Sequence, residues 1–281
     1  MRSALSTPIR PPAVAGRFYP SGREALAAEV ARHLAAAGSG AIAAAPPALV
    51  APHAGYAYSG PIAGSAFAAW QRSGFAPRRV VLLGPNHYVP LAGIALPAAS
   101  ALATPLGTLP VPAAVVDELL ALPFVSIDAA VHAPEHSLEV ELPFLQVLFG
   151  EVEIVPLLVG EAGPEQVAAA LAIAWSGPGT AVVVSSDLSH FLSYEEARAV
   201  DGRTAGRVCD LEGGVTPFEA CGARSLNGLL LAARRRGLAG RILDLRNSGD
   251  TAGPRDRVVG YGAFAFDERV GHGEQRSADA N

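Results

Sequence analysis

Three histidines in this chain of 281 residues, His53, His87 and His190, each follow a segment whose composition predicts a buried β-strand. In open α/β folds, ligands bind beside the carboxyl ends of the strands, where parallel strands share one edge of the sheet. The three imidazoles are therefore expected to converge on one site. Neutral imidazole is the commonest metal ligand in proteins, and two histidines with one anionic ligand leave open positions for a catalytic metal. The preceding strands are predicted at 48–52, 79–84 and 180–186.

Two further residues could supply the anionic or acid–base chemistry of such a site. Asp187 stands three residues before His190, so it could orient an imidazole and raise its basicity. Cys221 lies near the start of a predicted helix, a position that favours the thiolate, which is both a nucleophile and a soft metal ligand. The residue types alone leave another interpretation of Cys221 open, that of a small buried hydrophobic residue.

Other side chains are candidates for the wall of a pocket. Glu135 and His136 precede a predicted helix that Ser137 can cap, and their spacing does not decide between pocket and solvent. Asn86 directly precedes His87. Phe18 and Tyr58 could form an aromatic wall, although core packing is the more frequent role of such residues.

The elements that must position these residues alternate along the chain. This alternation predicts an α/β domain, either doubly wound or three-layered, with no internal repeat. Residues 1–12, which are rich in proline, are expected to be extended, and the polar residues 268–281 to be disordered. Helices are predicted at 24–37, 62–72, 112–122, 138–148 (with Pro143 as a kink or the true start), 164–175, 194–211 and 220–236. The remaining strands are predicted at 92–96, 152–159, 241–245 and 258–266.

The composition excludes several classes of function. A net charge of −5 and a pI of about 5.8 do not suggest nucleic acid or an anionic membrane as a partner. No apolar run reaches the length of a membrane span and the first residues lack the apolar core of a signal peptide, so a cytoplasmic location is expected. Two cysteines do not make a disulfide framework. The chain has no dinucleotide fingerprint, phosphate-binding loop, HExxH sequence or serine-hydrolase elbow.

Several motifs together resemble the Memo family, whose bacterial members are called AmmeMemoRadiSam system protein B. They are AGRFYP, APHAGYAYSG, LGPNH, EHSLEVELPFLQ, VPLLVG, SSDLSHF and the CG before a long helix, and they are collinear from about residue 13 to 266. Memo proteins are similar in fold to class III extradiol dioxygenases of the LigB type. Those enzymes bind non-heme Fe(II) through two His and one Glu, with another His as the acid–base group. The resemblance thus implies one LigB-like α/β/α domain over residues 13–267 with a largely parallel or mixed sheet.

Carried over to this sequence, the resemblance makes His53 and His87 the imidazole ligands and His190, beside Asp187, the acid–base residue. Cys221 falls where the dioxygenases have Glu and where Memo proteins have Cys. A thiolate admits iron, copper or zinc, and Fe(II) is the metal that the resemblance favours. The thiolate is also oxidisable, so ring cleavage does not follow from the shared fold.

The preferred function is a metal-dependent redox enzyme, dioxygenase-like, with an unknown substrate. One alternative is a binding module for an anionic or phosphotyrosine-type ligand in the same cleft. A zinc hydrolase is another alternative. The family name also implies radical-SAM and AMMECR1-like partners; this chain has no CxxxCxxC and is not the radical-SAM component itself.

Overall fold

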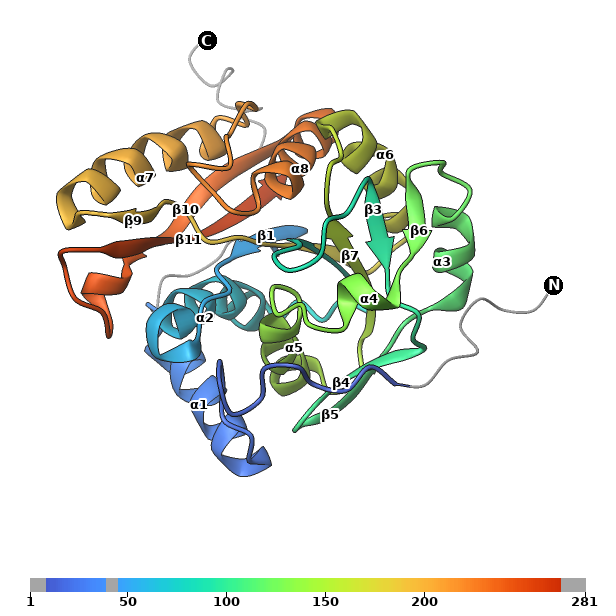
Figure 1. Ribbon diagram of the computed structural model, residues 1–281, viewed down its shortest axis with the longest axis horizontal. Helices are drawn as coiled ribbons and strands as arrows, with labels where there is room; N and C mark the ends of the chain where they lie inside the picture. The colour runs from blue at the N-terminus through green and yellow to red at the C-terminus, as the bar shows by residue number, and fades with distance from the viewer. Residues whose placement is uncertain (1–8, 39–44, 269–281) are drawn as a thin grey trace, which may run out of the picture.

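A mixed β-sheet lies between two layers of helices (Figure 1), in a computed structural model that describes residues 9–38 and 45–268. The strand order is β10-β11-β1-β8-β2-β7-β3-β6, and β9 pairs with β11. The four central strands run parallel, as expected for buried strands of continuous apolar sequence. They are β1 (Ala48–Ala51), β8 (Thr180–Ser185), β2 (Arg79–Pro85) and β7 (Glu153–Val159).

The register of these strands brings their carboxyl ends to one edge of the sheet. Ala51 at the end of β1 is opposite Ser185 at the end of β8. On the other side of β8, Leu83 of β2 is opposite Val184. The segments that leave β1, β8 and β2 therefore start side by side, and they carry the four sequence-predicted strand-end residues His53, His87, Asp187 and His190.

The outer strands make the sheet mixed. β11 (Val258–Glu268) is antiparallel to β1 and to β10 (Leu238–Asn247), and β3 (Ile94–Leu96) is antiparallel to β7. Four short strands were absent from the sequence-based prediction because three or four residues carry no measurable periodicity. These are β6 (Val125–Ile127), β9 (His190–Leu192) and the separate pair β4 (Ala101–Thr104) and β5 (Gly107–Pro110).

Helices cover both faces of the sheet, which confirms the three-layer α/β/α prediction (Figure 1). One layer holds α1 (Arg23–Ala36), α2 (Tyr56–Ser73) and α5 (Leu142–Phe149). The other layer holds α6 (Pro164–Ala174), α7 (Tyr194–Cys209) and α8 (Ala223–Arg235), and α3 (Ala113–Leu119) packs against α6. Short helical turns are α4 (Ala129–His132) and the 3₁₀-helices Glu139–Glu141 and Ser248–Asp250.

Two prolines have different roles from each other. Pro143 lies in the first turn of α5, so it marks the start of that helix rather than a kink. Pro61 was expected to open a helix at residue 62, and that expectation is wrong: α2 begins at Tyr56 and contains Pro61. The earlier start follows from a tertiary contact, because the Tyr56 N–H donates to the Phe18 carbonyl at 2.8 Å.

The two ends of the chain were predicted to be an extended segment, 1–12, and a disordered tail, 268–281. Within the predicted extended segment 1–12, Arg10 forms a β-bridge with Leu102, while residues 1–8 lie outside the described residues. Glu268 is the last residue of β11, and the predicted disordered tail after it also lies outside the described part. No helix in the described ranges is both long enough and apolar enough to cross a membrane.

We predict that His33 makes stability depend on pH. This residue is 2% exposed, and burial lowers its pKa to about 4, against 6.5 for a free histidine. Between those pKa values the unfolded chain binds more protons at this position than the folded protein does, so the free energy of unfolding rises with pH. The stabilisation is fully present above about pH 6.5. The contribution lost at pH 5 is about 2 kcal/mol.

Urea unfolding of the wild type and of His33→Leu at pH 7.5 and pH 5 measures this contribution. The wild type should lose more stability on acidification than the variant. His132, whose pKa burial also lowers to about 4, titrates in both proteins and cancels in the comparison. Equal losses in the two proteins would contradict the prediction.

Candidate metal centre

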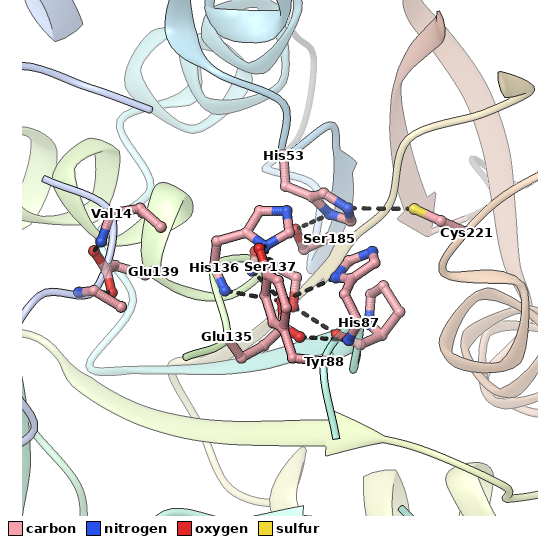
Figure 2. Close-up of polar contacts among 12 residues, drawn as sticks. Val14, His53, His87, Tyr88, Glu135, His136, Ser137, Glu139, Ser185 and Cys221 are labelled. Atoms are coloured by element: carbon pink, nitrogen blue, oxygen red, sulfur yellow. Dashed lines mark hydrogen bonds and ion pairs between the residues drawn. The ribbon is translucent and has the colours of Figure 1, made fainter. Parts of the chain in front are cut away.

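Three histidines, His53, His87 and His136, meet at the carboxyl edge of the sheet (Figure 2). One potential ligand nitrogen from each lies within 4.8 Å of those of the other two. The ring centroids of His87 and His136 are 4.7 Å apart, and the His53 centroid lies 5.3 Å from that of His87 and 5.5 Å from that of His136. His53 and His87 follow β1 and β2 as the strand-end argument predicts. His136 comes from the irregular segment between α4 and the 3₁₀-helix at 139–141.

Each ring has a protein partner on its Nδ1 atom. His53 Nδ1 is 2.8 Å from Ser185 Oγ, His87 Nδ1 is 2.9 Å from Glu135 Oε1, and His136 Nδ1 is 3.2 Å from the Tyr88 hydroxyl. With Nδ1 held in this way, Nε2 is the nitrogen left for a metal on His87 and His136, whereas His53 Nε2 lies 3.2 Å from the Cys221 sulfur. Histidine ligands in metalloproteins are usually held in this way, with the other ring nitrogen bonded to a carboxylate, carbonyl or hydroxyl.

Glu135 joins two of the rings. Its Oε1 accepts the hydrogen bond from His87 and also the main-chain N–H groups of His136 and Ser137, at 2.8 and 2.9 Å, and its Oε2 accepts the main-chain N–H of His87. The side chain is 3% exposed. Burial would raise its pKa, but the hydrogen bonds from His136 and His87 outweigh it and hold the pKa of Glu135 well below its usual range. Glu135 is therefore an anion that anchors the His87 and His136 segments to each other.

Cys221 approaches from the side of His53 opposite to His136, with its sulfur 3.2 Å from His53 Nε2 (Figure 2). Its main-chain N–H donates to the Asp187 carbonyl, which ties the start of α8 to the end of β8. Burial, together with the charge of Asp187, raises the pKa of the Cys221 thiol. The expectation was that the position near a helix N-terminus favours the thiolate. The surrounding protein groups instead favour the neutral thiol. A metal cation would supply the positive charge that a thiolate needs, so the donor set of imidazoles and a thiol fits a transition metal.

Asp187 and His190 lie near the cluster but do not form the expected hydrogen-bonded pair within the described residues. Asp187 Oδ1 instead accepts the main-chain N–H of His53 at 2.8 Å, so Asp187 fixes the backbone that carries this ring. Burial raises the pKa of Asp187, and the nearby His190 has the opposite influence. His190 is half-buried on β9, opposite Val259 of β11.

The remaining pocket candidates have distinct places. The Phe18 ring packs on His136 with the centroids 4.6 Å apart, and Asn86 lines the neighbouring cavity. Tyr58 is 43% exposed on α2. Sequence reasoning missed Ser185 and Tyr88 as partners of the site histidines. Ser185 is the last residue of β8 and opens the motif SSDLSHF, in which only Asp187 and His190 were singled out, and Tyr88 directly follows the motif LGPNH.

A cavity of about 660 Å³ opens beside the cluster. Its wall includes Cys221, a candidate metal ligand, and Asn86, the residue before His87. Arg224, in the first turn of α8, also lines the cavity. Glu161 stands on the same wall, and the rest is largely apolar, with Pro85, Leu91, Val159 and Pro217. The cavity provides room for a small molecule next to Cys221, and none of the three histidines lines it.

We predict that Gly222→Ala displaces Cys221. A Cβ at this position would lie 2.7 Å from both side-chain atoms of Ser186 and 2.9 Å from the Ser185 carbonyl. The start of α8 would have to move away from β8, at a cost of about 1–3 kcal/mol. Urea unfolding measures this cost. Gly206→Ala in α7 is the control, because a Cβ there meets nothing within 4 Å. Equal stability of Gly222→Ala and wild type would refute the prediction.

Comparisons with known proteins find relatives that match nearly the whole chain. The sequence model of the family described as "Memo-like protein" matches residues 10–265. A MEMO1 family protein of Pyrobaculum aerophilum is 33% identical over 288 residues, covering 92% of this chain and 99% of the relative. One from Thermotoga maritima is 35% identical, covering 90% and 97%. A solved structure of an uncharacterized protein from Escherichia coli K12 superposes with a TM-score of 0.49 at 15% identity, over 78% of this chain and 99% of that one. The chain belongs to the Memo-like protein family.

Proposed function

We propose that this protein is a metal-dependent redox enzyme that binds Fe(II) at the His53–His87–His136 cluster. The observation that carries the proposal is that each ring has a protein partner at Nδ1 and that one nitrogen of each ring lies within 4.8 Å of those of the other two. Such partners hold the rings of metal-binding histidines in one orientation. Cys221 beside His53 offers a fourth donor, and with His53 and His87 it makes the ligand set that the family resemblance implies.

The residues around the cluster have separable tasks in this proposal. A bound Fe(II) would supply Lewis acidity and electron transfer at positions that the protein leaves open. Glu135 and Ser185 keep the rings of His87 and His53 oriented. His190, half-buried at the margin, is the proposed acid–base group, which is the role that the family resemblance implies for it. The cavity lined by Cys221 and Asn86 would hold the substrate.

Anaerobic purification followed by metal quantification tests the proposal. Near-stoichiometric iron is the expected result. Stoichiometric zinc would instead support the hydrolase alternative, and copper would change the redox couple. Absence of any metal, together with no binding of added Fe(II) or Co(II), would refute the proposed centre. Cys221→Ser and His136→Ala then decide the ligand set, since only the true third ligand should be needed for binding.

A second candidate function rests on Arg224. Its guanidinium lines the cavity beside Cys221 and donates to the Gly160 carbonyl at 2.9 Å, with no carboxylate partner among the described residues. An arginine held in this way suits an anionic ligand, although Glu161 on the same wall opposes one. Titration of the metal-free protein with a phosphotyrosine peptide discriminates the two functions: micromolar binding without metal, lost in Arg224→Met, would favour a non-catalytic binding module.

Association with a radical-SAM protein and an AMMECR1-like protein is part of the proposal through the family resemblance. Co-purification with tagged protein from its native host tests this part. Recovery of neither partner, with and without reductant, would count against it.

A further inference from the structure

Arg10, near the beginning of the described chain, reaches the segment that carries Glu135 and His136. Its guanidinium makes three hydrogen bonds along this segment: Nε donates to the His132 carbonyl at 2.8 Å, Nη2 to the Glu135 carbonyl, and Nη1 to Glu139 Oε2 at 2.7 Å. Arg10 is 8% exposed and its partner Glu139 is 1% exposed. A planar guanidinium can satisfy three acceptors at fixed angles, which a lysine ammonium cannot do in the same geometry.

Glu139 collects further donors from the N-terminal segment. Its Oε2 also accepts the Ala13 N–H at 2.7 Å, and its Oε1 accepts the Val14 N–H at 3.0 Å and the Tyr19 hydroxyl at 2.6 Å. Every hydrogen bond of this buried carboxylate thus comes from residues 10–19. The family motif AGRFYP overlaps this segment, and the bonds to Glu139 explain its physical use here.

The same segment touches two separate parts of the metal site. Phe18 packs its ring on His136, with 4.6 Å between the centroids. The Phe18 carbonyl accepts the Tyr56 N–H at 2.8 Å, three residues after His53. Residues 10–19 therefore contact both the segment that carries His53 and the segment that carries His136, which are distant from each other in the sequence.

We infer that residues 10–19 are a clamp that sets the position of His136 relative to His53, and that Arg10 is its positioning residue. This inference rests on the proposed metal centre, and Arg10 itself touches neither metal nor substrate. Because the clamp holds two main-chain carbonyls before His136 and the Glu139 carboxylate after it, loosening it changes where the ring points before it unfolds the protein. The expected consequence is weaker metal binding by a protein that is still folded.

Arg10→Lys tests the clamp while keeping the positive charge beside Glu139. Co(II) is the probe, because its visible spectrum reports coordination geometry, and its dissociation constant is measured by competition with a chelator. Substitutions that disturb the support of a metal ligand cost about 10–100-fold in metal affinity, and this loss, with an altered Co(II) spectrum, is expected. Val208→Ala, in the core of α7, is the control: it should lower the unfolding midpoint without changing Co(II) affinity.

Hydrogen exchange on the metal-free protein gives an independent measurement. Arg10→Lys should speed amide exchange across residues 132–139 but not in β7, whereas a purely global role would raise exchange throughout. Wild-type Co(II) affinity and spectrum in Arg10→Lys, or unchanged exchange at 132–139, would overturn the clamp. Wild-type protein that binds no metal would overturn the proposed function, and the exchange comparison would still decide whether the clamp exists.

Discussion

His87→Ala is expected to abolish metal binding, with the dissociation constant for Fe(II) or Co(II) raised more than about 100-fold. Replacement of an outer residue costs about 10–100-fold, and removal of a ligand should exceed this range. His87 contributes one of the three converging nitrogens, and its ring is fixed by the hydrogen bond from Nδ1 to Glu135. Metal content after anaerobic purification and the Co(II) spectrum of the variant measure the effect.

Two matched variants separate loss of the ligand from loss of structure. His87→Asn places an amide N–H near the position of Nδ1, so it preserves the hydrogen bond to Glu135 but removes the distal nitrogen. It should bind metal as poorly as His87→Ala while unfolding nearer to the wild-type midpoint. His33→Leu removes another buried histidine, in α1, and should keep the full metal content. Full iron retention in His87→Ala would remove the proposed centre.

Glu135→Gln is expected to weaken both the fold and the metal site. The wild-type carboxylate accepts three main-chain N–H groups and the His87 ring, and it does so as a buried anion. The amide is neutral, and its NH₂ group faces donors, so the free energy of unfolding should fall by about 3 kcal/mol. Because the segments of His87 and His136 are both anchored to this group, metal affinity should fall about 10–100-fold.

Glu153→Gln is the matched control for this substitution. It makes the same chemical change in the partly exposed ion pair with Arg79, where the expected loss is below about 1 kcal/mol. Metal affinity should not change in the control. Unfolding and Co(II) competition measured on both variants check the prediction, and a Glu135→Gln protein with wild-type stability and affinity would show that the carboxylate charge is unimportant.

Part of this site was predictable because parallel strands end at the same edge of a sheet. His53 and His87 directly follow apolar runs, and parallel strands with aligned registers must release such residues at one edge. The α/β/α layering was predictable for a related reason, since strands apolar on both faces require helices on both sides. The resemblance to Memo proteins added Cys221 to the same place, and the sulfur does contact His53.

The sequence alone determined the layered fold, the family and the two strand-end histidines, because these depend on local periodicity and contiguous motifs. Only the tertiary structure decided that His136 faces the cluster, that Ser185 and Tyr88 hold the rings, and that Arg10 reaches Glu139. These contacts join residues up to 132 positions apart, mostly through irregular segments. Such segments have no periodicity, so their side-chain directions are set by hydrogen bonds to distant parts of the chain.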